Sequence, residues 1–224
     1  MCGRFTIMLE ADDLREILEV GQVPEDWRPR FNLAPSQPAG VVVDPVTRNV
    51  GWMKWGLVPG WAKDPEIGNR LINARAETLV EKPAFRQAFA RRRCLIPADG
   101  FFEWYHPAGG KGRGQPNHIR LAGGRPFFLA GLWERWKSAD VPDLLSFTII
   151  TTTANELVAT VHERMPVILT GATAWDWLSM HSVDELARFL RPYPAEEMEI
   201  RPVSLAVNNP ANDVPECIEP ISPS

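Results

Sequence analysis

The fold is constrained most by a series of short apolar segments, each ended by turn-forming residues. Segments rich in β-branched and aromatic side chains are typical of β-strands, and they occupy residues 41–43, 50–55, 94–97, 100–105, 127–136, 146–152, 167–169 and 199–204. Proline, at 21 residues, is scattered through loops and strand edges, where its missing N–H removes no sheet hydrogen bond. A chain with this pattern folds around a sheet and not as a helical bundle.

Helical patterns are fewer and shorter. Residues 12–20 have apolar side chains at helical spacing behind two acidic residues, and residues 83–92 begin with proline and end with arginine. Three further helices are predicted at 156–162, 174–180 and 183–190. The glycine-rich stretch 109–115 is predicted to be an exposed hairpin loop. We therefore predict a single-domain α+β fold, with a mostly antiparallel, barrel-like sheet and flanking helices.

Composition argues against several classes of protein. The 224 residues are 45% hydrophobic and 23% charged, as in ordinary globular domains. No stretch approaches the roughly 18 apolar residues of a membrane helix, and no export signal is evident, so we expect a cytoplasmic protein without a membrane partner. The three cysteines and four histidines show no metal-ligand spacing, so neither a metal nor a cofactor is expected.

Charge is distributed unevenly along the chain. The net charge is −4, yet residues 1–136 hold 19 Lys and Arg against 15 Asp and Glu, whereas residues 137–224 hold 5 against 13. A nucleic-acid-binding protein needs a local basic surface and not a basic total. The first part of the chain can supply one. The other interpretation is an acidic surface in the second part that aids solubility.

The first motif is MCGRF, at residues 1–5. If Met1 is removed, Cys2 carries a free amine and a thiol on adjacent carbons. The amine, with a pKa of about 7.7–8.0, can condense with an aldehyde, and the thiol can then close a thiazolidine ring. Alternatively the thiol serves as the nucleophile of a hydrolase, with its own amine as the base. The simplest alternative is a small residue at a frayed end.

Two further motifs place polar side chains in strand-like segments. In INARAET (72–78), Asn73 and Arg75 share one face if the segment is extended, and such a pair suits a phosphate or polar ligand. The alternative is a loop that bonds its own backbone. In CLIPADGFFEWY (94–105), Glu103 lies between two aromatic residues; it is either desolvated, with a raised pKa, or on a solvated face.

The remaining motifs contain a histidine and two tryptophans. His162, in VHERMPVIL (161–169), is either a general acid or base or a structural residue. In WGLVPGWAKDP (55–65), Trp55 and Trp61 either stack on unpaired bases or fill the core.

In order, the blocks MCGRF, RFNLAPSQ, WGLVPGW, INARAET, RCLIPADGFFEW, FFLAGLW, TTTAN, VHERMPVIL and RPVSLAVN resemble the SOS response-associated peptidase (SRAP) domain family. The resemblance covers residues 2–208, which we take as the domain, and residues 209–224 are then a tail that packs on the domain or trails it. One departure is Asn117-His118 after Gln115-Pro116, where the family usually has an aromatic residue. This departure puts a surface strand in doubt.

The resemblance implies a function. SRAP proteins recognise abasic sites in single-stranded DNA, and their N-terminal cysteine traps the sugar aldehyde as a thiazolidine crosslink. It implies that Cys2 is the nucleophile, that Asn73 positions the sugar and the cysteine, that Glu103 transfers protons, and that His162 opens the sugar ring. The implied DNA-binding residues are Arg4, Asn32, Pro35, Trp61, Arg75, Thr151 and Arg164. We expect a DNA-associated monomer.

Two other functions stay open. A thiol peptidase or autopeptidase would use Cys2, Asn73, Glu103 and His162 to cleave a peptide bond. A non-covalent reader of modified bases would bind DNA without needing Cys2.

Overall fold

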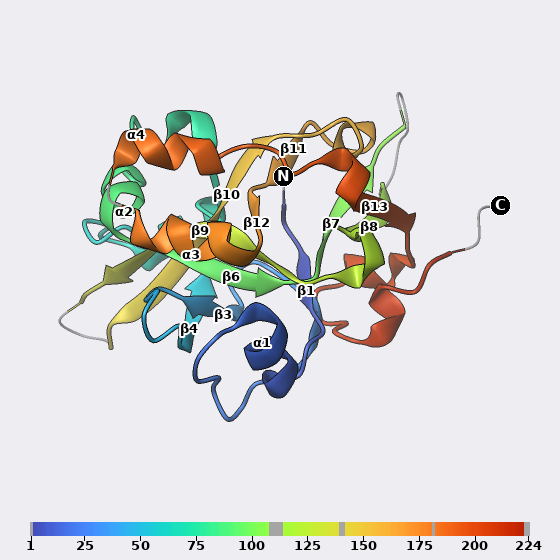
Figure 1. Cartoon of the computed structure of the whole chain (residues 1–224), viewed down its shortest axis with the longest axis horizontal. Helices are drawn as coiled ribbons and strands as arrows, with labels where there is room; N and C mark the ends of the chain where they lie inside the picture. Colours follow the sequence, from blue (N-terminus) through green and yellow to red (C-terminus); the bar gives the residue numbers. More distant parts are fainter. Residues whose placement is uncertain (1, 108–113, 139–141, 181, 222–224) are drawn as a thin grey trace.

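Five strands of the protein close into a barrel (Figure 1). The structure is a computed structural model that describes residues 2–107, 114–138, 142–180 and 182–221. The five strands are β3 (Pro38–Val42), β4 (Val50–Trp55), β6 (Arg93–Ala98), β9 (Phe127–Trp136) and β10 (Leu144–Thr153). Each strand pairs with the next in the order β4-β3-β6-β9-β10, and β10 returns to β4 in the one parallel pairing of this ring. Closure leaves the ring without an open edge.

Three short strands extend the barrel beside β10 and β9. Strand β5 (Asn73–Arg75) runs parallel to β10, β11 (Arg164–Pro166) runs antiparallel to it, and β12 (Ile168–Leu169) pairs antiparallel with β9. Segments distant in the sequence thus meet along β10, which lies between the strands of the INARAET and VHERMPVIL motifs.

A second, antiparallel sheet lies beside the barrel (Figure 1). Its strands, in spatial order, are β13 (Met198–Pro202), β8 (Gln115–Leu121), β7 (Gly100–Tyr105), β1 (Phe5–Ile7) and β2 (Arg30–Leu33). The chain passes from β6 of the barrel into β7 through Asp99 alone. Glycine is needed at position 100 because a Cβ there would lie 2.0 Å from Nε2 of His118.

Aromatic packing joins β1 to the barrel. The ring of Phe5 meets the indole of Trp55 edge-on, with centroids 5.2 Å apart, and Trp55 stacks on Phe147 at 6.3 Å. Trp55 is fully buried, and its Nε1 donates to the carbonyl of Ile72 at 2.9 Å. This single side chain therefore holds the second sheet, the barrel and the segment before β5 together.

The helices lie outside the sheets (Figure 1). The α-helices are α1 (Ala11–Leu18), α2 (Arg86–Arg91), α3 (Gly171–Ser179) and α4 (Val183–Leu186). The short 3₁₀ helices are η1 (Pro65–Arg70), η2 (Ala76–Thr78), η3 (Ala122–Gly124), η4 (Val158–Thr160), η5 (Ala187–Phe189), η6 (Ala195–Glu197), η7 (Leu205–Asn208) and η8 (Pro215–Cys217). Within the described residues, no helix has the length and apolar character needed to cross a membrane.

The predicted fold class is confirmed, whereas several element predictions need correction. The helix expected at 156–162 is only the turn η4, because the chain soon enters β11, whose pairing with β10 holds it extended from Arg164. The helix expected at 83–92 begins only at Arg86. Residues 115–121, which the sequence put in doubt as a surface strand, form the regular and mostly buried strand β8. Most of the predicted hairpin loop 109–115 lies outside the described residues.

Candidate functional site

Cys2 lies where the second sheet meets the barrel. The main chain before β1 continues the β1–β7 ladder, because the amide of Phe102 donates to the carbonyl of Arg4 at 3.0 Å. From the barrel side, Nδ2 of Asn73 donates to the carbonyl of Cys2 at 2.8 Å. Cys2 is fully buried, and its Sγ donates to the carbonyl of Arg4 at 3.8 Å. The cysteine is therefore fixed from two directions and not frayed.

Glu103 is the buried carboxyl group of this junction. It lies in β7, in register with Asn117 of β8, and only 3% of its surface is exposed. Burial raises the pKa of Glu103 to about 7. Burial, and secondly the nearby charge of Glu103, raise the pKa of the Cys2 thiol. Of the two interpretations of Glu103, the desolvated one is therefore confirmed.

Asn73 and Arg75 follow the predicted alternation of an extended segment. In β5, Ala74 is fully buried, whereas Arg75 is exposed on the opposite face. The Oδ1 atom of Asn73 is buried and accepts no hydrogen bond from the described part of the chain. Asn73 thus retains one acceptor close to the Cys2 backbone, while Arg75 presents its guanidinium to solvent.

His162 is held by the segment that leads into β11. Its Nδ1 accepts a hydrogen bond from the amide of Arg164 at 2.9 Å, so in the neutral imidazole the proton is assigned to Nε2. Burial lowers the pKa of His162 below its usual value. At neutral pH the ring is therefore a neutral hydrogen-bond donor through Nε2.

Arg164 and Thr151 are tied into an ion-pair network. The guanidinium of Arg164 forms two bonds to the carboxylate of Glu77, at 2.6 and 3.0 Å, and Nη2 also donates to the carbonyl of Thr151 at 2.7 Å. This pairing lowers the pKa of Glu77. Thr151 is fully buried. Phosphate contacts by Arg164 and Thr151 stay predictions, and Glu77, inside the INARAET motif, is a partner that sequence reasoning missed.

Arg4 and Asn32 are joined by a hydrogen bond. Nη1 of Arg4 donates to Oδ1 of Asn32 at 2.7 Å, and Asn32 is fully buried. Asn32 lies in β2 and is fully buried, so its amide presents no surface to a base. Pro35, two residues beyond β2, is partly exposed.

The two tryptophans of the WGLVPGW motif lie in different environments. Trp55 fills the core, as described above, whereas Trp61 is 62% exposed. Two clefts share Trp61, Pro83 and Ala84. The smaller, of about 440 Å³, is lined also by Asn73, Arg75, Lys82 and the apolar Leu71 and Phe85.

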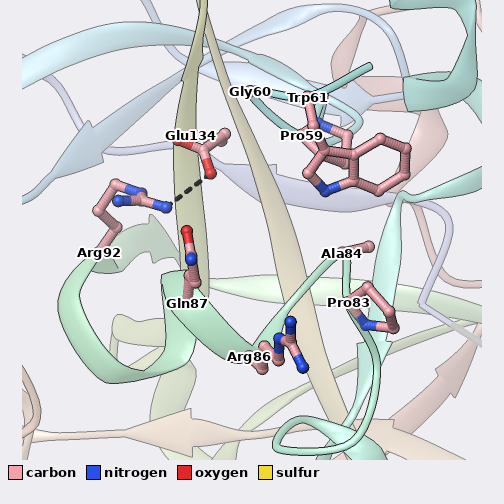
Figure 2. Close-up of a pocket in the computed structure, with 9 residues that line it drawn as sticks. All are labelled: Pro59, Gly60, Trp61, Pro83, Ala84, Arg86, Gln87, Arg92 and Glu134. Atoms are coloured by element: carbon pink, nitrogen blue, oxygen red, sulfur yellow. Dashed lines mark hydrogen bonds and ion pairs between the residues drawn. The ribbon is translucent and has the colours of Figure 1, made fainter.

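The larger cleft has a volume of about 840 Å³ (Figure 2). Arg86 and Gln87 of α2 line it, together with Arg92, which pairs with Glu134 at 2.8 Å. The shared residues make the two clefts one groove, hereafter the Trp61 groove, that leads outward from Asn73. Its cations Lys82 and Arg86 were not singled out from the sequence, because isolated basic residues carry no spacing signal.

Comparisons with known proteins identify the family of the chain. The family model of the SOS response associated peptidase (SRAP) matches residues 1–210. The abasic site processing protein YoqW of Bacillus subtilis is 45% identical, over 98% of this chain and 99% of its own. The abasic site processing protein HMCES of Gallus gallus is 32% identical, over 99% of this chain and 78% of its own.

Solved structures show the same fold. A crystal structure of a protein from Bacteroides thetaiotaomicron superposes with a TM-score of 0.87 at 26% identity, covering 99% of this chain and 100% of that one. Another crystal structure, of a protein from Bordetella bronchiseptica, superposes with a TM-score of 0.78 at 26% identity, covering 91% of this chain and 100% of that one. Because the family model covers residues 1–210 and the relatives match almost the whole chain, this chain belongs to the SRAP family.

Proposed function

We propose that this protein processes abasic sites in single-stranded DNA by binding them covalently through Cys2. The observation that carries the proposal is the meeting of Cys2, Asn73 and Glu103 at one buried junction, with a cationic and aromatic groove leading away from it. The relatives named as abasic site processing proteins support the DNA lesion as the substrate.

The chemistry requires removal of Met1, which frees the α-amine of Cys2. The open-chain abasic sugar has an aldehyde at C1′. The amine nitrogen attacks C1′, and the resulting carbinolamine loses water to form an imine. Sγ then attacks C1′ while the thiol proton passes to the nitrogen, which closes a thiazolidine. One C–N and one C–S bond form, and the aldehyde oxygen leaves as one water.

Glu103 suits the proton transfers of this sequence. With a pKa of about 7, its carboxyl group is present in both protonation states near neutral pH. The acid form can donate to the departing hydroxyl, and the carboxylate can accept the proton of the thiol. A base is needed because burial keeps the Cys2 thiol protonated.

His162 and Asn73 support the sugar. The Nε2–H of His162 can donate to the ring oxygen of the closed sugar, which favours the open aldehyde. The Oδ1 of Asn73, which has no hydrogen-bond partner among the described residues, can accept a hydrogen bond from the freed amine or from a sugar hydroxyl. Both roles use hydrogen bonds that the uncharged side chains of His162 and Asn73 can make at pH 7.

The Trp61 groove suits the strand beside the lesion. Exposed Trp61 offers a face on which an unpaired base stacks, and Arg75, Lys82 and Arg86 offer charges to phosphates. A few such contacts suffice in a protein of net charge −4, because a covalent bond supplies the residence time.

The test mixes the protein with single-stranded DNA that carries one abasic site and resolves the mixture on a denaturing gel. We expect a heat-stable shifted band with the wild type and with Cys94→Ala, a matched loss of one buried thiol, but not with Cys2→Ala. Cys2→Ser keeps the amine, so it should give a band only after borohydride reduction. Peptide turnover without DNA, and no band, would favour the peptidase instead.

A further inference from the structure

The last residues of the predicted domain and the first residues of its predicted tail pack beside the site. Residues 203–218, hereafter the C-terminal clamp, fold back over the second sheet. Val203, Val207 and Cys217 are fully buried against Phe102 of β7, the neighbour of Glu103. Nε1 of Trp104 donates to Oδ1 of Asn208 at 2.6 Å. The clamp therefore covers the strand that carries Glu103.

Asn32 holds three carbonyl groups of the clamp at once. Its Nδ2 lies 3.2 Å from the carbonyl of Val207, 3.1 Å from that of Asn209 and 2.6 Å from that of Asn212. Its remaining polar atom, Oδ1, accepts from Arg4 at 2.7 Å. A fully buried amide is thus shared between the clamp and one arginine.

Asp213 fastens the clamp to β2 beside Asn32. Its Oδ1 accepts from the amides of Phe31 at 2.6 Å and Asn32 at 2.9 Å, and its Oδ2 accepts from Nε of Arg30. Strand β2 is the edge strand of its sheet. The bonds from Asp213 satisfy backbone amides of β2 that a neighbouring strand would otherwise pair with.

Arg4 is held by this arrangement through one nitrogen. Nη1 donates to Oδ1 of Asn32 and, at 2.7 Å, to the carbonyl of Val207 in the clamp. The guanidinium lies 6.0 Å from the ring centroid of Trp104. Every hydrogen bond that the Arg4 guanidinium donates within the described ranges uses Nη1, so Nε and Nη2 can donate to a phosphate.

We propose that Asn32 and the C-terminal clamp position Arg4 for the DNA, so that Asn32 is a positioning residue and not a base contact. A free arginine has many rotamers, and fixing it before binding removes that cost from the binding step. The inference rests on the proposed function, because it assigns the held guanidinium to a phosphate of the bound strand.

The experiment measures affinity against salt concentration by fluorescence anisotropy. The probe is a single-stranded oligonucleotide with a tetrahydrofuran abasic analogue, which has no aldehyde and reports binding alone. Arg4→Ala should weaken binding about tenfold and lower the salt slope by about 0.7, the value of one phosphate contact. Asn32→Ser should cause most of that loss although it removes no charge. The double variant should bind no worse than Arg4→Ala. If the losses of affinity of the two single variants instead multiply in the double variant, the proposal is overturned.

A second variant, Asp213→Ala, distinguishes release of the clamp from a simple change of charge, because the two predict opposite changes in affinity. Asp213→Ala removes a negative charge near the DNA, so simple electrostatics predicts tighter binding, whereas release of the clamp predicts weaker binding with a lower salt slope. Unchanged or tighter binding would contradict the proposal. The control is Arg93→Lys, which keeps its charge but loses bonds to the carbonyls of Trp177 and Phe89, neither of which belongs to the clamp. Its salt slope should match that of the wild type at any loss of stability.

The same preparations are mixed with the aldehyde-bearing strand. If the wild type neither binds the analogue nor crosslinks, the proposed function fails and the inference fails with it. If the wild type does both and Asn32→Ser behaves like it, only the inference fails.

Discussion

Glu103 shows how one strand position sets the chemistry of a carboxyl group. It follows Phe102 in β7, its surface is 3% exposed, and the loss of water around it raises its pKa to about 7. The same carboxylate contributes to the raised pKa of the Cys2 thiol. The acid and the nucleophile are therefore electrostatically coupled, and the protonation of one affects the other.

The rate of crosslinking should depend on Glu103 and on pH. We expect Glu103→Gln to slow crosslinking or its reversal about 100-fold, the usual size of a general acid–base effect, while the fold is kept. The wild-type rate should bend near pH 7 through Glu103. This bend should vanish in the variant because Gln does not titrate, which leaves only the dependence on the Cys2 amine at about pH 7.7–8.0. Quenched time courses from pH 5.5 to 8.5 measure both. Wild-type rates in Glu103→Gln would contradict the proton-transfer role.

At the scale of elements, strand β1 is anchored by a buried polar network. Oγ1 of Thr6 donates to Oδ1 of Asp99 at 2.5 Å and lies 3.1 Å from Nε2 of His118. Because the hydroxyl proton goes to Asp99, His118 is the donor in the second bond, which requires Nε2 to carry a proton. Burial, and then the charges of Arg120 and Arg201, lower the pKa of His118 to about 4.

Acid should therefore weaken the protein through His118. The unfolded chain binds a proton near pH 6.5, whereas the folded chain binds it only near pH 4, so stability is lost as pH falls through this window. The loss is at most about 3 kcal/mol. His118→Gln keeps a donor near the position of Nε2 but does not titrate, so the wild type should lose more stability than the variant between pH 6.5 and 4. Urea denaturation at several pH values measures the difference; parallel curves would refute the assignment.

Most strands were predictable from the sequence because their apolar alternation is local. Residues 127–136 form β9 with the predicted bounds. The helix expected at 156–162 failed because the tertiary pairing of β11 with β10 outweighs the local helical spacing. Strand β8 was missed because the proline and glycines at its start resemble a loop, and its pairing with β7 and β13 is tertiary.

At the scale of the molecule, the site is assembled from segments far apart in sequence. The main chain before β1, the barrel strand β5 and strand β7 bring Cys2, Asn73 and Glu103 together. Motif spacing cannot show such meetings, and only the family resemblance grouped these residues beforehand. Two contacts escaped even that grouping: the pairing of Arg164 with Glu77, and the attachment of Arg4 to Asn32.

The DNA-binding face should be local and basic although the protein is acidic. Arg75 is exposed and lines the Trp61 groove. Arg75→Ala should weaken binding to single-stranded DNA and lower the salt slope by about 0.7. Arg15→Ala makes the same change of charge on α1, where Arg15 pairs with Asp12, and should leave the slope unchanged. Anisotropy titrations at several salt concentrations separate the two. Equal slopes for both variants would contradict a phosphate contact by Arg75.

A covalent bond at Cys2 changes the mass of the intact protein, so mass spectrometry reports it without a secondary readout. The wild type is incubated with an oligonucleotide that carries one abasic site, denatured and weighed. We expect the mass of the protein without Met1, plus that of the oligonucleotide, minus one water, and no such species for Cys2→Ala. A protein that lacks Met1 but forms no adduct, or an equal adduct on Cys2→Ala, would show that Cys2 does not form the bond.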